Sequence, residues 1–229
     1  MRQFSLPVTE IKTLGRQILV RCKSDGGPAP VSAPGQVCLA HTDLPAQPFL
    51  RVPLYPFHRQ PSSFEFLISP AHPYASLEPG MALDLIGPGG HGFDLPARAA
   101  HLLLIAGSPE RLLPLIHLAL ERQFAITFLI PERTPLPELP SAIEIQRGPL
   151  TAELVTWADL IALDVPNPWD TAREIRAFAS ASMRPASFIQ AFITPPLPCG
   201  VGACQACWVE TQETHSRKLA CVEGPVFQV

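Results

Sequence analysis

Four of the six cysteines in this chain lie in one short window near its C-terminal end, and they constrain the fold more than any other feature. Cys199, Cys204, Cys207 and Cys221 have the spacing C-x4-C-x2-C-x13-C. The first three match the plant-type [2Fe-2S] spacing. Gly200 and Gly202, between the first two cysteines, allow backbone conformations that a Cβ would forbid. The pattern predicts that these four thiolates hold an iron–sulfur cluster.

Two other interpretations of the cysteines stay open. The first is a structural zinc site, although four-cysteine zinc sites usually show two close pairs and Cys221 has no close partner in sequence. The second is a pair of disulfides, which would require an oxidising compartment, and the chain shows no secretory signal.

Charge and hydropathy exclude several classes of partner. The net charge of −3 and the absence of a basic stripe argue against nucleic acid as a partner. The N-terminus lacks the apolar stretch of a signal peptide, and the apolar run 101–106 is too short to span a membrane. We therefore expect a cytoplasmic protein without membrane segments, in which thiols stay reduced. The 28 prolines are dispersed among apolar residues and do not indicate disorder.

Residues 1–98 are predicted to form an antiparallel β-barrel domain. Short β-branched or alternating runs recur between turn signals, at 17–22, 36–40, 63–68 and 82–86. Cys22 and Cys38 lie within two of these runs, and we expect them to be buried structural thiols.

Residues 99–197 are predicted to form a doubly wound α/β domain with a parallel sheet. Strands are expected at 101–107, 125–130, 142–145, 160–163 and 187–192. Helices are expected at 109–122, with Ser108 as N-cap and a possible kink at Pro114, and at 171–180. Alternating strands and helices are typical of such folds.

Residues 198–229 are predicted to form a cluster-binding hairpin segment, with strands at 208–211 and 218–222 that bring Cys221 back beside the loop 199–207. The expected fold class is thus multidomain α+β. The first turn after a strand in the α/β domain normally carries the glycines that bind a pyrophosphate. Here it has only Gly107, and Glu110 would repel a phosphate. We therefore do not expect NAD to bind.

In the order of these parts and in several short sequence motifs, the chain resembles the electron-transfer subunit of dihydroorotate dehydrogenase B, within the ferredoxin-reductase-like superfamily. The strongest matches are the runs 199–207 and Cys221-Val222-Glu223-Gly224-Pro225-Val226-Phe227. The runs 34–36, 78–80 and 87–93 match further family landmarks in order.

The resemblance implies a specific chemistry. In that family the subunit carries FAD and a [2Fe-2S] cluster, and it passes electrons from NADH to a catalytic partner subunit that holds FMN, in pyrimidine biosynthesis. It implies Cys199, Cys204, Cys207 and Cys221 as cluster ligands here. It also implies flavin contacts from the run 50–55, namely Arg51, Pro53, Leu54 and Tyr55.

The flavin and nicotinamide motifs depart from the family pattern. Val52 stands where the flavin-contacting arginine is expected, and Tyr55 replaces a hydroxyl residue. The run 69–76 aligns with a phosphate loop but has no glycine, and the Cys-Gly-Pro motif is absent at 164–168. The metal-binding motif is kept while the phosphate-binding motifs are lost.

We therefore expect an electron-transfer subunit with one [2Fe-2S] cluster that relays electrons to or from a catalytic flavoprotein partner, dihydroorotate dehydrogenase-like, in a hetero-oligomer. FAD binding is left open, and no residue is assigned as a catalytic acid or base. One alternative is a complete FAD-dependent NADH reductase with atypical flavin contacts through Arg51 and Tyr55. Another is a zinc-stapled, non-catalytic scaffold protein.

Overall fold

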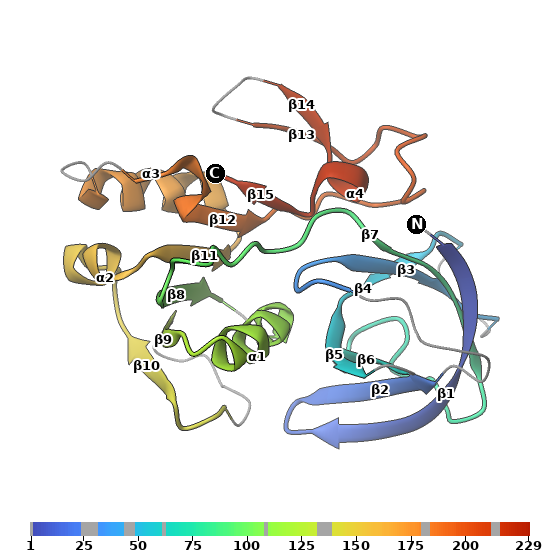
Figure 1. The fold of residues 1–229 in the computed structure, drawn as a ribbon. Coiled ribbons are helices and arrows are strands. Elements are labelled where there is room, and N and C mark those ends of the chain that lie inside the picture. Colours follow the sequence, from blue (N-terminus) through green and yellow to red (C-terminus); the bar gives the residue numbers. More distant parts are fainter. Residues whose placement is uncertain are drawn as a thin grey trace.

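The fold consists of a curled antiparallel sheet, a parallel sheet flanked by helices, and a C-terminal segment that lies across both (Figure 1). The computed structural model describes residues 2–23, 32–43, 49–60, 63–107, 110–131, 139–179, 184–211 and 216–229. The predicted fold class is confirmed. The boundaries at residues 98 and 197 stay predictions.

The first sheet has seven antiparallel strands in the order β4-β3-β7-β1-β2-β6-β5. Its two edge strands, β4 and β5, follow one another in the chain with only Tyr55 between them. The two edges must therefore lie close together, and the sheet curls into the predicted barrel (Figure 1). The strands are β1 (Arg2–Leu14), β2 (Gln17–Lys23), β3 (Val37–His41), β4 (Val52–Leu54), β5 (Pro56–Gln60), β6 (Ser63–Ile68) and β7 (Ala82–Gly89).

The second sheet has the order β10-β9-β8-β11-β12-β15, with every pair parallel except β12 and β15. Helix α1 packs on one face, and α2 and α3 pack on the other, so the sheet is doubly wound as predicted. Its elements are β8 (His101–Ala106), α1 (Leu113–Glu121), β9 (Ala125–Ile130), β10 (Ile143–Arg147), α2 (Ala152–Trp157), β11 (Leu160–Asp164), α3 (Pro168–Ala179) and β12 (Ile189–Phe192).

The helix predicted at 109–122 begins later than the sequence indicates. A 3₁₀ turn at Glu110–Leu112 precedes α1, whose N-cap is Leu112 with no side-chain cap. Pro114 therefore lies in the first turn, where its missing N–H costs nothing, and it does not act as a kink. The predicted N-cap, Ser108, lies outside the described residues.

The C-terminal segment differs from the predicted hairpin in one respect. Strands β13 (Trp208–Glu210) and β14 (Arg217–Leu219) pair as expected. Cys221, however, lies on the helical turn α4 (Ala220–Glu223) and not on a strand, so the prediction of a strand over 218–222 was wrong beyond Leu219. The chain then continues into β15 (Val226–Gln228), which extends the second sheet.

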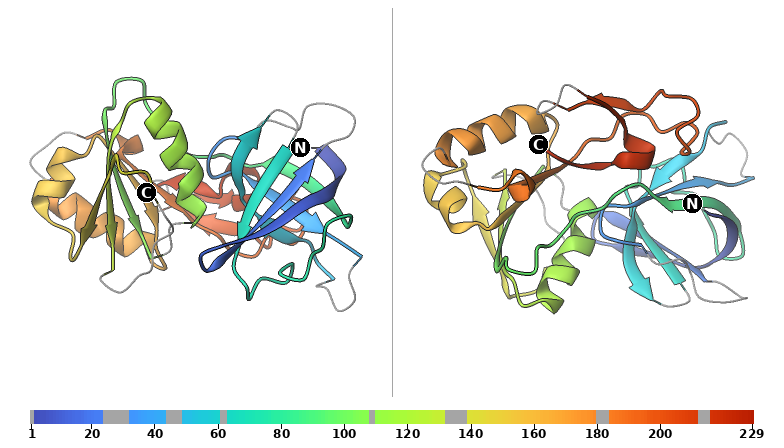
Figure 2. Two further views of the ribbon diagram at one scale, coloured as in Figure 1. Left: turned by 90° about the horizontal axis from the view of Figure 1, so that it is seen from below. Right: turned by 45° about the horizontal axis from the view of Figure 1, so that its top comes forward.

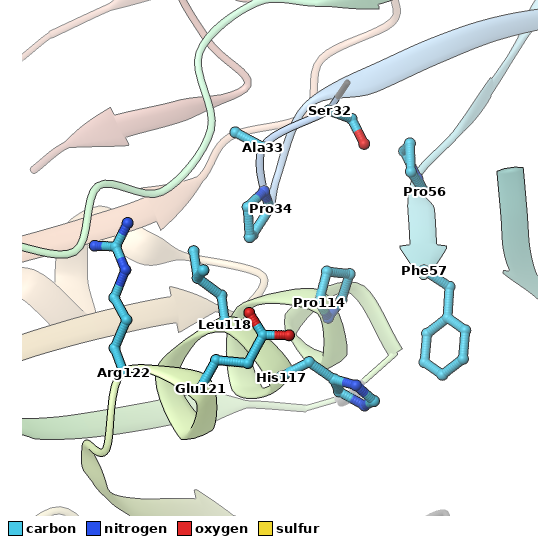
Figure 3. Close-up of a pocket in the computed structure, with 10 residues that line it drawn as sticks. All are labelled: Ser32, Ala33, Pro34, Pro56, Phe57, Pro114, His117, Leu118, Glu121 and Arg122. Carbon is cyan, nitrogen blue, oxygen red and sulfur yellow. The ribbon is translucent and has the colours of Figure 1, made fainter. Parts of the chain in front are cut away.

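The barrel and the second sheet meet beside α1. The ring of His117 on α1 stands edge-on to Phe57 of β5, with centroids 5.9 Å apart. A hollow of about 430 Å³ lies at this contact, between α1 and the residues Pro34 and Pro56 (Figure 3). It contains none of the predicted site residues. No helix in the described parts of the chain combines the length and the apolar character needed to cross a bilayer.

Candidate metal centre

The loop from Cys199 to Cys204 bends around the sulfur of its own first cysteine. Gly200 and Gly202 have φ of 70° and 78°, which is the region that favours glycine. A Cβ on Gly200 would also lie 2.3 Å from Leu39 Cδ1 in the barrel, so a larger residue there would have to displace the Leu39 side chain. The two glycines that the sequence singles out therefore shape the loop and seat it against β3.

Backbone N–H groups of this loop converge on Cys199. The N–H of Cys204 lies 3.5 Å from Cys199 Sγ. This bond is the main reason that the pKa of Cys199 falls to about 6; burial opposes the fall, and the N–H groups of Val201 and Ala203 add to it. Backbone N–H groups that converge on a sulfur atom in this way stabilise negative charge on it.

The other two cysteines form a second, buried pair. Cys207 and Cys221 are each 1% exposed, and their sulfur atoms are 3.3 Å apart. The Ala220 N–H donates to the Cys207 carbonyl at 3.0 Å, which fixes α4 beside the end of the loop. Burial raises the pKa of Cys221 to about 12, and an N–H bond from Gly202 opposes this. A bound metal would deprotonate such a thiol outright.

The donor set fits a binuclear cluster. One pair, Cys199 and Cys204, is partly open to solvent, and the other pair, Cys207 and Cys221, is buried. A [2Fe-2S] cluster takes four cysteines, two on each iron. Within the described ranges, no group of three or more Cys, His, Asp or Glu side chains already stands in the arrangement of a metal site. Cys22 and Cys38 lie in the barrel core, away from this loop, as buried thiols.

Hydrogen bonds join the runs 34–36 and 87–93 to each other and to the C-terminal segment at Gly224. His91 donates its N–H to the Gly224 carbonyl at 2.5 Å, and the Gln36 side chain donates to the Gly90 carbonyl at 2.8 Å. A Cβ on Gly90 would stand 1.8 Å from the Gly224 carbonyl oxygen. The run 87–93 therefore anchors the segment that carries Cys221.

The four residues expected to contact a flavin already have partners within the protein. Arg51 binds the backbone oxygen of Asp84 at 2.8 Å and also the Asp84 carboxylate. Pro53 pairs with Leu39 in the sheet, and Leu54 is only 2% exposed. Tyr55 lies under the guanidinium of Arg111. Arg51 and Tyr55 are therefore not placed to hold a flavin, although both line a hollow of about 540 Å³ together with Pro53.

The segment that aligns with the flavin phosphate loop is also closed by side chains. Tyr74 is 1% exposed, and its hydroxyl donates to the Ala40 carbonyl at 2.6 Å. His72 packs on the Tyr74 ring at 5.4 Å and accepts a hydrogen bond from the Tyr74 N–H at 3.1 Å. Burial lowers the pKa of His72, so this ring gains no positive charge that would attract phosphate.

The turn after β8 holds a residue pair that the sequence analysis missed. Glu110, predicted to repel a phosphate at this turn, accepts a hydrogen bond from the side chain of Gln17 in the barrel. Arg111 points instead to Asp164 at the end of β11, with Nε 2.9 Å from Oδ2. The sequence signals were a lone arginine after Gly107 and a lone acid at the end of an apolar strand, but nothing in the sequence links the two.

Comparison with known proteins agrees with this geometry. The iron–sulfur cluster binding domain of dihydroorotate dehydrogenase B matches residues 196–229. The electron transfer subunit of dihydroorotate dehydrogenase B (NAD(+)) from Caldanaerobacter subterraneus subsp. tengcongensis is 27% identical over 172 residues, or 67% of each chain. The resemblance inferred from the sequence is thereby confirmed.

Solved structures share the fold at low identity. An NADH-dependent reduced ferredoxin-NADP oxidoreductase has a TM-score of 0.74 and 19% identity, covering 97% of this chain and 87% of its own. The ferredoxin reductase of carbazole 1,9a-dioxygenase has a TM-score of 0.63 and 18% identity, covering 83% of this chain and 66% of its own. Residues 196–229 therefore match the iron–sulfur cluster binding domain of dihydroorotate dehydrogenase B, and the chain as a whole has a ferredoxin-reductase-like fold.

Proposed function

We propose that this chain is an electron-transfer subunit in which Cys199, Cys204, Cys207 and Cys221 hold one [2Fe-2S] cluster. The proposal rests on the arrangement of the four thiols in two pairs. In one pair, the sulfur of Cys199 accepts hydrogen bonds from backbone N–H groups. When bound, the cluster supplies one-electron redox chemistry. The chain supplies a rigid cradle, N–H donors to the sulfurs and burial on one side, which together tune the potential.

The exposed side of the cradle indicates where an electron would leave. Cys204 is exposed, and Val201 and Val222 beside it are 56% and 45% exposed. Exposed apolar side chains around a redox centre suit contact with another protein. We propose a catalytic flavoprotein subunit, dihydroorotate dehydrogenase-like, as that partner, in a hetero-oligomer. Since the ligands are free thiols, we place the complex in the reducing cytoplasm.

The test is a count of metal and a spectrum of anaerobically purified protein. We expect two irons per chain and visible cluster bands that bleach with dithionite. Cys221→Ser should abolish these bands, whereas the matched variant Cys22→Ala, in the barrel core, should retain them. One zinc per chain with no iron would refute the proposal and favour the zinc-stapled scaffold. Retention of the cluster in Cys221→Ser would refute the ligand set.

A further inference from the structure

Two hollows meet at the carboxyl ends of the parallel strands, and Arg111 stands between them. One hollow, of about 660 Å³, extends from Asp164 toward Trp169 and Trp208. The other, of about 540 Å³, extends from Tyr55 toward Arg51 and the segment 194–198. Both are lined by Arg111, Thr194 and Pro195. In open α/β sheets this crevice is where ligands bind.

The side chain of Arg111 is fixed in the crevice by contacts from three directions. It makes a two-pronged ion pair with Asp164 at the end of β11, whose side chain is 5% exposed. Its Nη1 donates to Thr194 Oγ1 at 3.2 Å, just after β12. Planar bidentate pairing of this kind holds a guanidinium in one orientation.

The guanidinium also lies against two aromatic rings. Its central carbon is 5.4 Å from the centroid of Tyr55 and 4.8 Å from that of Phe192. The two rings themselves meet edge to face at 5.5 Å. A guanidinium is flat and delocalised and stacks on aromatic faces as a small planar ring does. The Arg111 side chain therefore fills a space suited to a planar aromatic group.

We infer that Arg111, held by Asp164, occupies a latent ring-binding site over Tyr55 and closes the crevice to an isoalloxazine or similar planar ring. This inference rests on the proposed function only in its consequence for electron flow. Because the ring-binding site over Tyr55 is closed, electrons enter and leave the cluster through its exposed edge at Val201, Cys204 and Val222. The chain then acts as a relay between protein partners, without a flavin of its own.

The experiment uses riboflavin, which has the ring system but no phosphate. The run 69–76, which aligns with the phosphate loop, is closed by His72 and Tyr74. Because riboflavin has no phosphate, its binding depends on the ring site and not on this run. Riboflavin binding is measured by equilibrium dialysis against the iron-loaded protein. The main variant is Arg111→Ala with Asp164→Asn, since removal of the arginine alone would leave a buried, unpaired carboxylate. The matched control is Arg173→Ala, which breaks an exposed ion pair on α3.

We expect the double variant to bind riboflavin at least about ten-fold more tightly than the wild type and the control. Equal riboflavin binding by the wild type and by a double variant whose circular dichroism is native would overturn the inference. FAD that co-purifies with the wild-type protein would overturn it as well.

The iron count of each preparation keeps this test separate from that of the proposed function. If the protein lacks iron but the double variant gains riboflavin binding, the electron-transfer function fails and the closed ring site stands. If the cluster is present and the double variant gains nothing, the function stands and the role of Arg111 fails.

Discussion

Replacement of Gly90 by alanine should detach the cluster-bearing segment from the rest of the molecule. Gly90 has φ of 73°, and a Cβ there would lie 1.8 Å from the Gly224 carbonyl oxygen. Because the backbone of residue 90 fixes the position of a Cβ and the atom that it would meet is a backbone oxygen, no side-chain rotation can relieve this contact. The segment 221–227 must move away, and the 2.5 Å hydrogen bond from His91 to Gly224 is lost.

The magnitude can be worked out with Gly15→Ala as a reference. Gly15 has a similar φ of 57° but nothing within 4 Å of its Cβ position. Alanine at such a φ costs about 1–2 kcal/mol, and this should be the whole effect at Gly15. At Gly90 the carbonyl of the buried Gly224, left without its partner, adds about 1–3 kcal/mol. We therefore expect Gly90→Ala to lower the free energy of unfolding by about 2–5 kcal/mol in total, which is most of the stability of a marginal domain.

The assay is unfolding in urea, followed by circular dichroism and by the visible bands of the cluster. Gly90→Ala should lower the midpoint for both signals far more than Gly15→Ala, and it should speed the loss of iron. If the two variants have the same free energy of unfolding, the Gly90–Gly224 contact does not hold the segment in place.

Two further predictions concern the barrel. Tyr74→Phe removes the buried hydrogen bond to Ala40, so it should lower the free energy of unfolding by about 1–3 kcal/mol. The iron content should stay unchanged. Loss of iron would show that the barrel loop supports the metal site. Burial disfavours the charge of Asp84, but hydrogen bonds from Arg51 and Gln3 outweigh it and hold the pKa of this carboxyl below its usual range. Its contribution to stability is therefore present above the unfolded pKa of about 3.9 and lost as pH falls through the lowered folded value. Asp84→Asn should destabilise the protein at neutral pH but not in strong acid, and an equal loss at both pH values would contradict this.

Local sequence signals predicted most of the two sheets. The apolar run at β8 and the turn signals around β6 and β7 correspond to strands in the structure. Strand β1 was missed although Phe4, Leu6 and Val8 stand at every second position, because Pro7 interrupts this run and most of the 13 residues are exposed or half-buried. It is a strand because β2 and β7 pair with it on both sides, which is long-range information.

The same limit applies to the site. The cysteine spacing predicted the loop around Cys199, because glycines and ligands are close in sequence. The helical turn at Cys221 was missed, since four residues carry too little periodicity to define a helix. The contact of Arg111 with Asp164 joins residues 53 positions apart, and no pattern within either segment indicates it.

Strand β15 has a consequence for how the protein comes apart. It pairs with β12, the last parallel strand of the α/β sheet, and so joins the segment that carries the thiols to that sheet, as the red C-terminal strand shows in Figure 2. Phe227 packs in the core on one face of this sheet. The segment is therefore not an appended module that could melt by itself. It should belong to the same cooperative unfolding unit as the parallel sheet, with amide protons of β12 and β15 exchanging at similar rates. Stability anywhere in that sheet then sets how long the thiols stay assembled.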